Sequence, residues 1–396
     1  MKKIIMFKGD IETQGYFSEQ MAKSFRQMGH DVLVYDLERP WEYTGKLLRF
    51  VQKGNTVVIS FNFHGMCGEA QFMDEEGEWF WDAFRIPCYN IVVDHPMFYY
   101  NLLSMRPKDY HQISIDREHQ RFMNRFFPEV DADLFLPLAG TPLRENGSYK
   151  RWEERRFDVV MTGNYGAPER FDKFINRNGE EYAAFYRGMI DELLASPDKC
   201  VTQVCMEHIR REIPEVTEAE LKETMPNITF IDLYVRHARR RDVVRTLVDA
   251  GIRVHVFGGR WDEMECKHPE NLINEDARDS KGCLEAISEA RISLNVMPWF
   301  KEGAHDRIYN SMLNGAVSLT DSNTYLDTIL LDGVNCRIYQ GTQLESLPGI
   351  VRELLGNPAK AQQIADAGFR MAMAGQRWAD RCQVLHDLIE SRDGRL

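Results

Sequence analysis

The sequence lacks most of the patterns by which a binding site is usually recognised. Its eight cysteines form no CxxC pair and no zinc-type set with histidine, which argues against a structural zinc site. Neither GxGxxG nor GxxxxGK(S/T) occurs, so the dinucleotide fingerprint and the P-loop are both absent. The first residues have too short an apolar run for a signal peptide. We therefore expect a cytoplasmic protein with reduced thiols and no metal.

The chain also lacks an excess of positive charge and any long apolar run. Its net charge is -12, whereas a general nucleic-acid binder normally needs a basic face, so we expect no nucleic-acid partner. The densest basic run is Arg236–Arg245, which we interpret as the solvated face of a helix. No segment approaches the ~20 apolar residues of a transmembrane span. The 396 residues suffice for two or three domains of an ordinary enzyme.

Short apolar runs alternate with helical segments, and this alternation predicts parallel α/β sheets. The polar, irregular stretch after residue 140 interrupts the alternation, which then starts again near residue 157. We predict an N-terminal domain over 1–145, a linker over 146–156, a second doubly wound domain over 157–380 and a C-terminal helix over 381–396. Strands are expected at 3–9, 30–38, 55–63, 86–94, 110–116, 133–140, 157–162, 252–259, 292–299 and 316–322.

Polar residues follow several of these strands, and ligands of open parallel sheets bind outside the carboxyl ends of the strands. In the first domain this rule selects Asp10, His64, Asp94 and His95. Each also has a simpler interpretation: Asp10 as a helix cap, Asp94 and His95 as a turn, and His64 as a packed loop residue, which we favour for His64. In the second domain the rule selects the turns TGNYG at 162–166 and GGRW at 258–261 and the loop at 298–307.

The segment Lys301–Asn323 places an acid, a histidine, an arginine and an asparagine just before a buried strand. If a helix starts near His305, its free N–H groups together with Arg307 suit a phosphate. Glu302 precedes this helix and suits sugar hydroxyls, and Asn310 follows Glu302 by eight residues, about two helical turns, so it can reach another part of the same ligand. The set fits a nucleotide-diphosphate sugar. The structural alternative is that Arg307 pairs with Asp306 or Asp321.

The stretch Glu302–Val317 resembles the donor-site signature of GT-B glycosyltransferases, in which a Glu is followed after seven residues by a second Glu, a small-residue helix and a glycine. Glu302 matches the first Glu, whereas Asn310 replaces the second. The sequences VVDHP, HDRIYNSMLNGAVSLTDSNTYL and GNPAKAQQIADAGFRMA are similar to the CgeB-type, spore-maturation group of bacterial glycosyltransferase-like proteins. The likeness is strong near the C-terminus and weak from Ala167 to Asp249.

The resemblance implies an α/β fold of the GT-B type, with two doubly wound Rossmann-like domains facing a central cleft. The first would bind the acceptor and the second the nucleotide sugar, without a metal or other cofactor, and the final helix would cross back to the first. Glu302 would orient the sugar, and Asp94, His95 or Asp10 would take the acceptor proton if the reaction inverts. The expected donor-binding residues are Thr162, Gly163, Asn164, Tyr165, Gly258, Gly259, Arg260, His305, Asp306, Arg307 and Asn310.

Three other functions compete with sugar transfer. A sugar-nucleotide epimerase or hydrolase would use the same donor site, and a non-catalytic nucleotide-sugar-binding protein would explain the loss of the second Glu. A Rossmann oxidoreductase is disfavoured because its fingerprint is missing. The acceptor, whether a glycan, a protein, a lipid or a small molecule, is not specified by the sequence.

Overall fold

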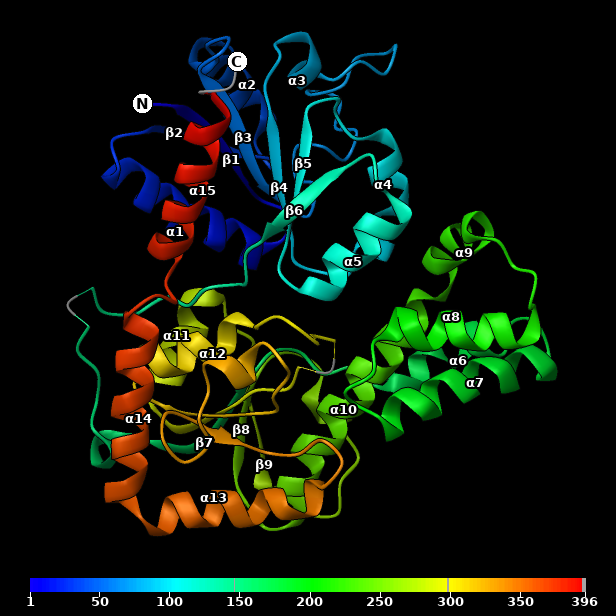
Figure 1. Cartoon of the computed structure of the whole chain (residues 1–396). Helices are drawn as coiled ribbons and strands as arrows, with labels where there is room; N and C mark the ends of the chain where they lie inside the picture. Colours follow the sequence, from blue (N-terminus) through cyan, green and yellow to red (C-terminus); the bar gives the residue numbers. More distant parts are fainter. Residues whose placement is uncertain (146, 298, 394–396) are drawn as a thin grey trace. The chain divides into compact units, whose positions relative to one another are not determined.

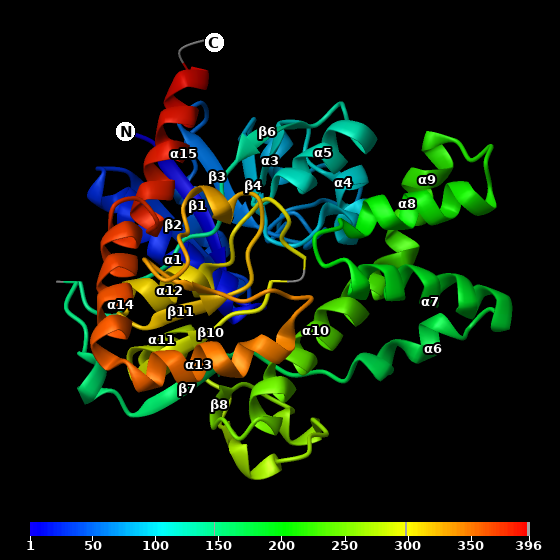
Figure 2. The same ribbon diagram turned by 60° about the horizontal axis from the view of Figure 1, so that its bottom comes forward.

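The computed structural model describes residues 1–145, 147–297 and 299–393. They form two compact units: unit 1 consists of Met1–Ala139 and the residues from Arg377 onward, and unit 2 of Gly140–Gln376. Each unit is built around one parallel sheet with helices on its faces (Figures 1 and 2). Asn146, where the predicted linker begins, Pro298 in the predicted ligand loop and the last three positions of the predicted C-terminal helix lie outside the described residues.

The sheet of unit 1 has six parallel strands in the order β2-β1-β3-β4-β5-β6. All six correspond to predicted strands, although β6 begins two residues earlier than expected. The order reverses between β1 and β3, which marks the switch point of a doubly wound sheet. The strands are β1 (Lys3–Lys8), β2 (Asp31–Asp36), β3 (Thr56–Phe61), β4 (Cys88–Val92), β5 (Tyr110–Ser114) and β6 (Asp131–Phe135). The helices are α1 (Glu12–Gln27), α2 (Pro40–Phe50), α3 (Phe80–Ala83), α4 (Tyr100–Met105), α5 (Arg117–Phe126) and α15 (Trp378–Asp393).

The last helix, α15, packs beside α1 in unit 1 although it is separated from α1 by the whole of unit 2 (Figure 1). The ring of Trp378 lies 4.7 Å from that of Phe17, and the Arg381 guanidinium donates to the carbonyl of Pro137 over 2.7 Å. Farther along α15, Arg392 pairs with Asp131 of β6. Helix α15 is therefore attached to the rest of unit 1 by aromatic packing at Trp378, by the hydrogen bond of Arg381 and by the ion pair of Arg392.

Unit 2 has the strand order β12-β11-β10-β7-β8-β9, again entirely parallel, and its switch point lies between β7 and β10. Four of these strands were predicted, whereas β9 and β12 were not. The strands are β7 (Phe157–Thr162), β8 (Val254–Phe257), β9 (Leu272–Glu275), β10 (Ala290–Leu294), β11 (Val317–Thr320) and β12 (Arg337–Ile338). The helices are α6 (Asp172–Ile175), α7 (Glu180–Ala195), α8 (Val201–Glu212), α9 (Glu218–Thr224), α10 (Thr229–Asp249), α11 (Ser280–Ser288), α12 (Asp306–Leu313), α13 (Leu347–Gly356) and α14 (Pro358–Met373).

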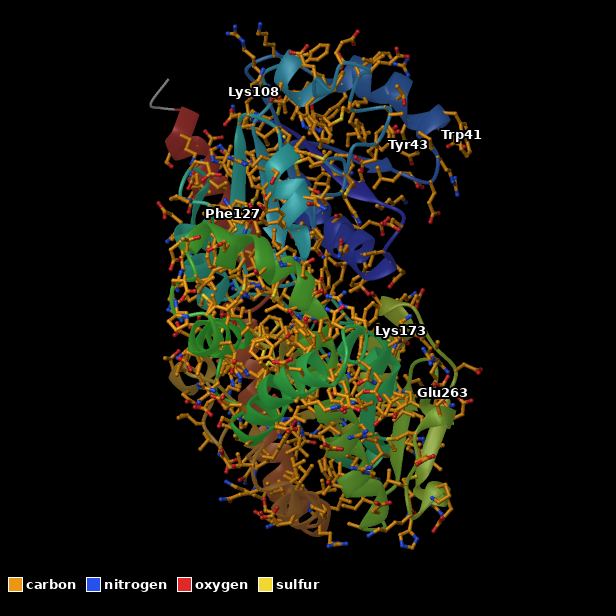
Figure 3. All side chains as sticks on the ribbon, turned by 90° about the vertical axis from the view of Figure 1, so that its right-hand side faces the viewer. Trp41, Tyr43, Lys108, Phe127, Lys173 and Glu263 are labelled. Carbon is orange, nitrogen blue, oxygen red and sulfur yellow. The ribbon has the colours of Figure 1, made fainter. Side chains whose placement is uncertain are left out.

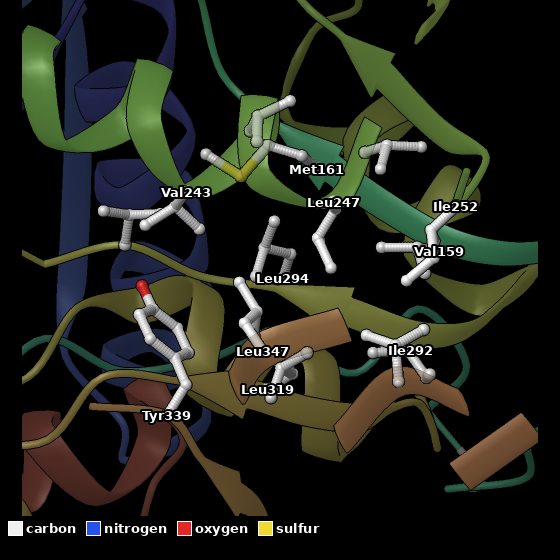
Figure 4. Close-up of a cluster of buried hydrophobic side chains, with 14 of the residues drawn as sticks. Val159, Met161, Val243, Leu247, Ile252, Ile292, Leu294, Leu319, Tyr339 and Leu347 are labelled. Atoms are coloured by element: carbon white, nitrogen blue, oxygen red, sulfur yellow. The ribbon is translucent and has the colours of Figure 1, made fainter. Parts of the chain in front are cut away.

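The core of unit 2 lies between its central strands and the helices α10 and α13. Figure 4 shows Val159, Leu294 and Leu319 from three neighbouring strands meeting Leu247 of α10 and Leu347 of α13. All five side chains are buried. Strands covered on both faces read as continuous apolar runs, which is why the sequence identifies β7, β10 and β11 readily.

The apolar spacing of the sequence predicts a helix over 239–250, whereas helix α10 begins ten residues earlier, at Thr229. The basic run Arg236–Arg245 therefore lies inside a long helix whose first turns join the helical arm α6–α9, which stands to one side of the sheet (Figures 1 and 2). Arg239 is buried and donates to the carbonyls of Gly341 and Leu194. The interpretation of this run as a purely solvated face is wrong.

Candidate functional site

Helix α12 follows the switch point of unit 2, and its N-terminus carries the predicted anion-binding residues. Asp306 is its first residue and His305 its N-cap, which confirms the predicted helix start. The Nδ1 atom of His305 accepts a hydrogen bond from the Arg307 backbone N–H over 3.2 Å, and its Nε2 lies 2.8 Å from the Arg307 guanidinium. Arg307 is only 8% exposed and contacts the Met161 sulfur at the end of β7 over 3.9 Å. Arg307 is therefore held rigidly between α12 and β7.

A second arginine, which is half-buried, adds positive charge beside Arg307. Arg240 of α10 donates to the backbone carbonyl of Asn164 over 2.7 Å, while its Nε is buried and has no hydrogen-bond partner among the described residues. Burial, together with the charge of Arg307, lowers the pKa of Arg240 to about 9. One helical turn earlier, Arg236 lies over the ring of Trp299 at 4.5 Å. The guanidinium groups are thus close enough to repel one another, an arrangement that an anionic ligand would stabilise.

The acidic neighbours neutralise this cluster only in part. Arg236 pairs with Asp232 over 2.6 Å. Within the described part of the chain Arg307 forms no close ion pair, although the charges of Asp306 and Asp321 raise its pKa against the lowering by burial, so the structural alternative considered for Arg307 is realised in part. Burial raises the pKa of Asp321 to about 6, and both of its carboxylate oxygens lie 3.0 Å from the Met297 N–H. Asp321 also lines a cavity of about 430 Å³ at the carboxyl ends of β10, β11 and β12. Burial, together with the charge of Arg307, lowers the pKa of His305 to about 4, so His305 is neutral at pH 7.

The two glycine-containing turns bind to each other. The Gly259 N–H donates to the Asn164 side-chain oxygen over 2.8 Å, and the Tyr165 N–H donates to the Gly259 carbonyl over 3.0 Å. A Cβ atom on Gly258 would lie 2.2 Å from the Gly163 carbonyl oxygen, so glycine is required for this approach. These N–H groups are already used within the protein. Thr162, the last residue of β7, is buried beneath them.

Arg260, which follows the second turn, is not part of the Arg307 cluster. It adopts a left-handed conformation with φ of 69° and donates two hydrogen bonds, of 2.7 and 2.8 Å, to the Glu263 carboxylate. Glu263 thereby raises the pKa of Arg260. The role of second cation beside Arg307 is better filled by Arg240.

Asn310 and Glu302 occupy different surroundings. The Asn310 side-chain oxygen accepts from the Thr141 N–H over 2.8 Å, and its amide donates to Asp306 over 2.9 Å. A glutamate could not donate to Asp306, so this pair of bonds explains an amide at a position where the related signature has an acid. Glu302 is half-buried in the loop before α12, which Asn323 fastens by donating to the Gly303 carbonyl over 2.9 Å.

In unit 1, Asp10 and His64 lie together at the switch point between β1 and β3. The His64 Nε2 is 3.6 Å from the Asp10 carboxylate, with the Asp10 side chain 72% exposed and the His64 side chain 5% exposed. Burial lowers the pKa of His64, and Asp10 partly offsets this effect. Asp10 has φ of 61°, and Asn62 and Phe63 after β3 also have positive φ. Strained backbone of this kind is often retained at functional sites.

Asp94 and His95 are held by their own loop. The Asp94 carboxylate accepts from Asn62 over 3.2 Å and from the Tyr99 hydroxyl over 3.3 Å. The Nδ1 of His95 accepts from the Met97 N–H over 3.2 Å, and its buried ring packs edge-on against His119. Asn62 connects Asp94 to the strained turn after β3, so Asp94 supports the same edge of the sheet as Asp10.

Two features of the site were not recognised in the sequence. His64 is buried, which confirms its interpretation as a packed loop residue, but its contact with Asp10 was not recognised. The available signal was that both residues follow strands at a switch point. Arg236 and Arg240 were interpreted as solvated, yet their spacing of four residues places them on one face of α10.

Residues 1–145, 147–297 and 299–393 contain neither a membrane-spanning helix nor a metal-binding cluster. No helix there combines the length and the apolar character that crossing a bilayer requires. No group of three or more His, Cys, Asp or Glu side chains is arranged to hold a metal ion.

Residues 236–387 match the family model of glycosyl transferase-like proteins. This match begins inside α10 at Arg236 and takes in the rest of α10, α12 and the strands of unit 2 that follow α10. It shows that the chain carries a glycosyltransferase domain, and the two six-stranded parallel sheets with their flanking helices have the arrangement of the GT-B fold.

Solved structures support the fold at low sequence identity. An alpha-glucosyltransferase in complex with UDP is 10% identical, with a TM-score of 0.60 over 98% of this chain and 100% of that chain. AviGT4, a glycosyltransferase involved in avilamycin A biosynthesis, is 10% identical, with a TM-score of 0.54 over 100% and 99%. Sucrose-phosphate synthase from Thermosynechococcus elongatus is 11% identical, with a TM-score of 0.51 over 100% of both chains. No curated protein sequence matches the chain.

Proposed function

We propose that this glycosyltransferase is a bacterial, cytoplasmic enzyme of the CgeB type that takes its sugar from a nucleotide-diphosphate donor. The observation that supports this proposal is the pair of guanidinium groups of the buried Arg307 and the half-buried Arg240 at the switch point of unit 2. Sugar transfer builds negative charge on the leaving diphosphate, and preorganised cations in a partly buried site stabilise it strongly. Because the arginines supply this charge, the proposal requires no metal.

The other donor-site residues would act around this pair. Neutral His305 orients the Arg307 guanidinium, and Glu302 accepts hydrogen bonds from the donor sugar. The bonded turns of Asn164 and Gly259 hold the end of β7 in position, and Thr162, Gly163, Tyr165 and Gly258 belong to the same support. Asn310 would act through Asp306 and the start of unit 2 instead of binding ribose with a charge.

We assign the acceptor base to Asp10 and a positioning role to His64. Asp10 is the exposed member of the pair, so its carboxylate can take the proton of an acceptor hydroxyl while the bond between the anomeric carbon and the diphosphate oxygen breaks. His64 is buried behind it and limits the orientations of the carboxylate. This assignment predicts inversion at the anomeric carbon. Asp94 would act by holding the turn after β3 in place.

The narrower family and the compartment rest on separate support. The three segments that resemble the CgeB-type group include the whole of α12 and most of α14. All eight cysteines are free thiols, as a reducing compartment would keep them.

The proposal is tested by the melting temperature of the purified protein with a panel of nucleoside diphosphates and their sugars, beginning with UDP. A bound ligand raises the melting temperature by mass action, and we expect one base to do so in the wild type but not in Arg307→Ala. Arg253→Ala removes an exposed arginine outside the site and serves as the control. No shift with any nucleotide, or equal shifts in both variants, would contradict the donor site. Release of free sugar without an acceptor would indicate a hydrolase instead.

A further inference from the structure

A groove of about 680 Å³ opens on unit 2 between α6, the first turn of α10 and the turn that contains Arg260. We call it the basic groove. Every ionisable side chain that lines it is cationic, and its floor is aromatic. The cations are Arg170, Lys173, Arg177 and Arg260, and the aromatic rings are those of Phe171, Phe174 and Phe230.

The positive charge of the basic groove is largely unneutralised in a chain whose net charge is -12. Within the described residues, Arg170, Lys173 and Arg177 take part in no ion pair. The nearby carboxylates are engaged elsewhere: Glu169 pairs with Arg241 over 2.7 Å and Asp172 with Arg187 over 3.4 Å. A concentration of one sign of charge in a concave surface favours a ligand of the opposite sign.

The aromatic rings hold these cations in place. The Lys173 ammonium lies 5.0 Å from the centre of the Phe174 ring, and the Arg177 guanidinium lies 5.8 Å from that of Phe230. The two rings are nearly parallel, with centres 6.0 Å apart and an interplanar angle of 21°, and Phe174 is 37% exposed. The basic groove therefore offers fixed cations beside an apolar surface, which suits an anion attached to an apolar or ring-shaped body.

The basic groove adjoins the turns of the candidate donor site. A Cβ atom on Gly166 would lie 3.3 Å from the Arg170 guanidinium, so Arg170 packs directly against the end of the first turn. Arg260 follows Gly259, which is bonded to Asn164. Figure 3 shows Lys173 and Glu263, the partner of Arg260, on the same side of unit 2.

We propose that the basic groove binds the phosphate of a phosphate-bearing acceptor, with Arg170, Lys173 and Arg177 on the phosphate oxygens and Phe174 against the organic part. The role as acceptor site rests on the proposed function, whereas the binding itself does not. A dissolved phosphate ester and a phospholipid headgroup both present this phosphate group. The volume of the groove is in the range that small organic ligands occupy.

The test uses the full chain and the variant Arg170→Gln/Lys173→Gln/Arg177→Gln, whose three positions are exposed. The control Arg210→Gln/Arg211→Gln/Lys267→Gln removes the same charge from exposed positions outside the groove. Calorimetry measures binding of glycerol 3-phosphate and tripolyphosphate, and sedimentation measures binding to phosphatidylcholine vesicles with and without phosphatidylglycerol. We expect about a 10-fold loss of affinity in the groove variant and less than about a 2-fold loss in the control, because charge-assisted hydrogen bonds are the strong ones.

The probes distinguish the two sources of phosphate. A groove-dependent loss with the dissolved compounds supports a phosphate ester, and one seen only with phosphatidylglycerol vesicles supports a headgroup. Equal losses in both variants, or no binding of any probe, would overturn the proposal. UDP binding is measured in parallel. If the wild type does not bind UDP, the donor-site proposal fails, but the result for phosphate binding in the basic groove still holds. If the groove variant still binds UDP, the basic groove and the donor site are separate binding sites.

Discussion

The two units have the same kind of sheet but opposite chemistry at the carboxyl ends of their strands. At the switch point of unit 1 an exposed carboxylate, Asp10, lies against a buried imidazole, His64. At the switch point of unit 2 lie the guanidinium groups of the buried Arg307 and the half-buried Arg240. Under the proposed function, one doubly wound design offers a proton acceptor in one case and an anion site in the other. The strand order locates a site, and only the loop residues decide its chemistry.

The sharpest way to break this comparison is to remove the carboxylate of unit 1. We expect Asp10→Asn to lower kcat by about 10²- to 10⁴-fold, the range that a positioned general base contributes, with donor affinity unchanged. His64→Gln should lower kcat less, by about 10-fold, and should change its pH profile, because His64 acts only by orienting Asp10. Steady-state kinetics and donor titration check both variants. An unchanged kcat in Asp10→Asn would refute the base and favour retention of configuration.

The matching change in unit 2 is expected to act on binding. Arg307→Ala should weaken nucleotide-sugar binding by about 100-fold, because a buried charge-assisted contact to the diphosphate is lost. Arg307→Lys should recover only part of this loss, since an ammonium lacks the planar fork of arginine. Isothermal titration with the nucleotide found in the melting panel measures both. Equal affinity in Arg307→Ala and the wild type would contradict the proposal that unit 2 binds the diphosphate through Arg307.

His305 supplies a pH test that belongs to unit 2 alone. Its pKa in the folded protein is about 4, below the usual value of 6.5, so the unfolded chain binds more protons between these values. The free energy of unfolding should therefore fall as the pH drops from 6.5 to 4, by up to about 3 kcal/mol from this residue. Urea unfolding of the wild type and His305→Gln at several pH values measures it, and identical slopes would contradict the assignment.

The smallest expected effect comes from restoring the acid of the related signature. Asn310→Glu would replace the bond to Asp306 with repulsion between two carboxylates, so we expect a loss of about 1–2 kcal/mol in the free energy of unfolding. Asn310→Gln keeps an amide and is the matched control. If Asn310→Glu is as stable as the wild type and binds donor more tightly, the position has retained its ribose-binding role.

The sequence predicted the parts of the fold that carry strong local signals. The central strands are continuous apolar runs, whereas β9 is a four-residue, partly exposed strand and β12 has only two residues, so neither has a readable period. The early start of α10 was missed because its first turns pack against the helical arm, where apolar and polar residues alternate irregularly. Local patterns cannot show such tertiary support.

The residues of the candidate site could be predicted from the sequence, but the residues that they contact in the folded chain could not. Arg307 and the cap at His305 follow from a helix start after a strand. The bond between Asn310 and the Thr141 N–H joins residues far apart in the chain, and so does the pairing of Asp10 with His64. Contacts of this kind depend on strand order, which the sequence did not specify.

The position of α15 has a consequence for how the protein is made. Unit 1 precedes unit 2 in the chain, yet the helix that covers α1 leaves the ribosome only after the whole of unit 2. The Gly140 N–H donates to the Gln376 carbonyl over 2.8 Å, so the segment that enters unit 2 is bonded to the segment that leaves it. During synthesis unit 2 can therefore close completely while Phe17 is still uncovered, and unit 1 matures only after α15 has emerged.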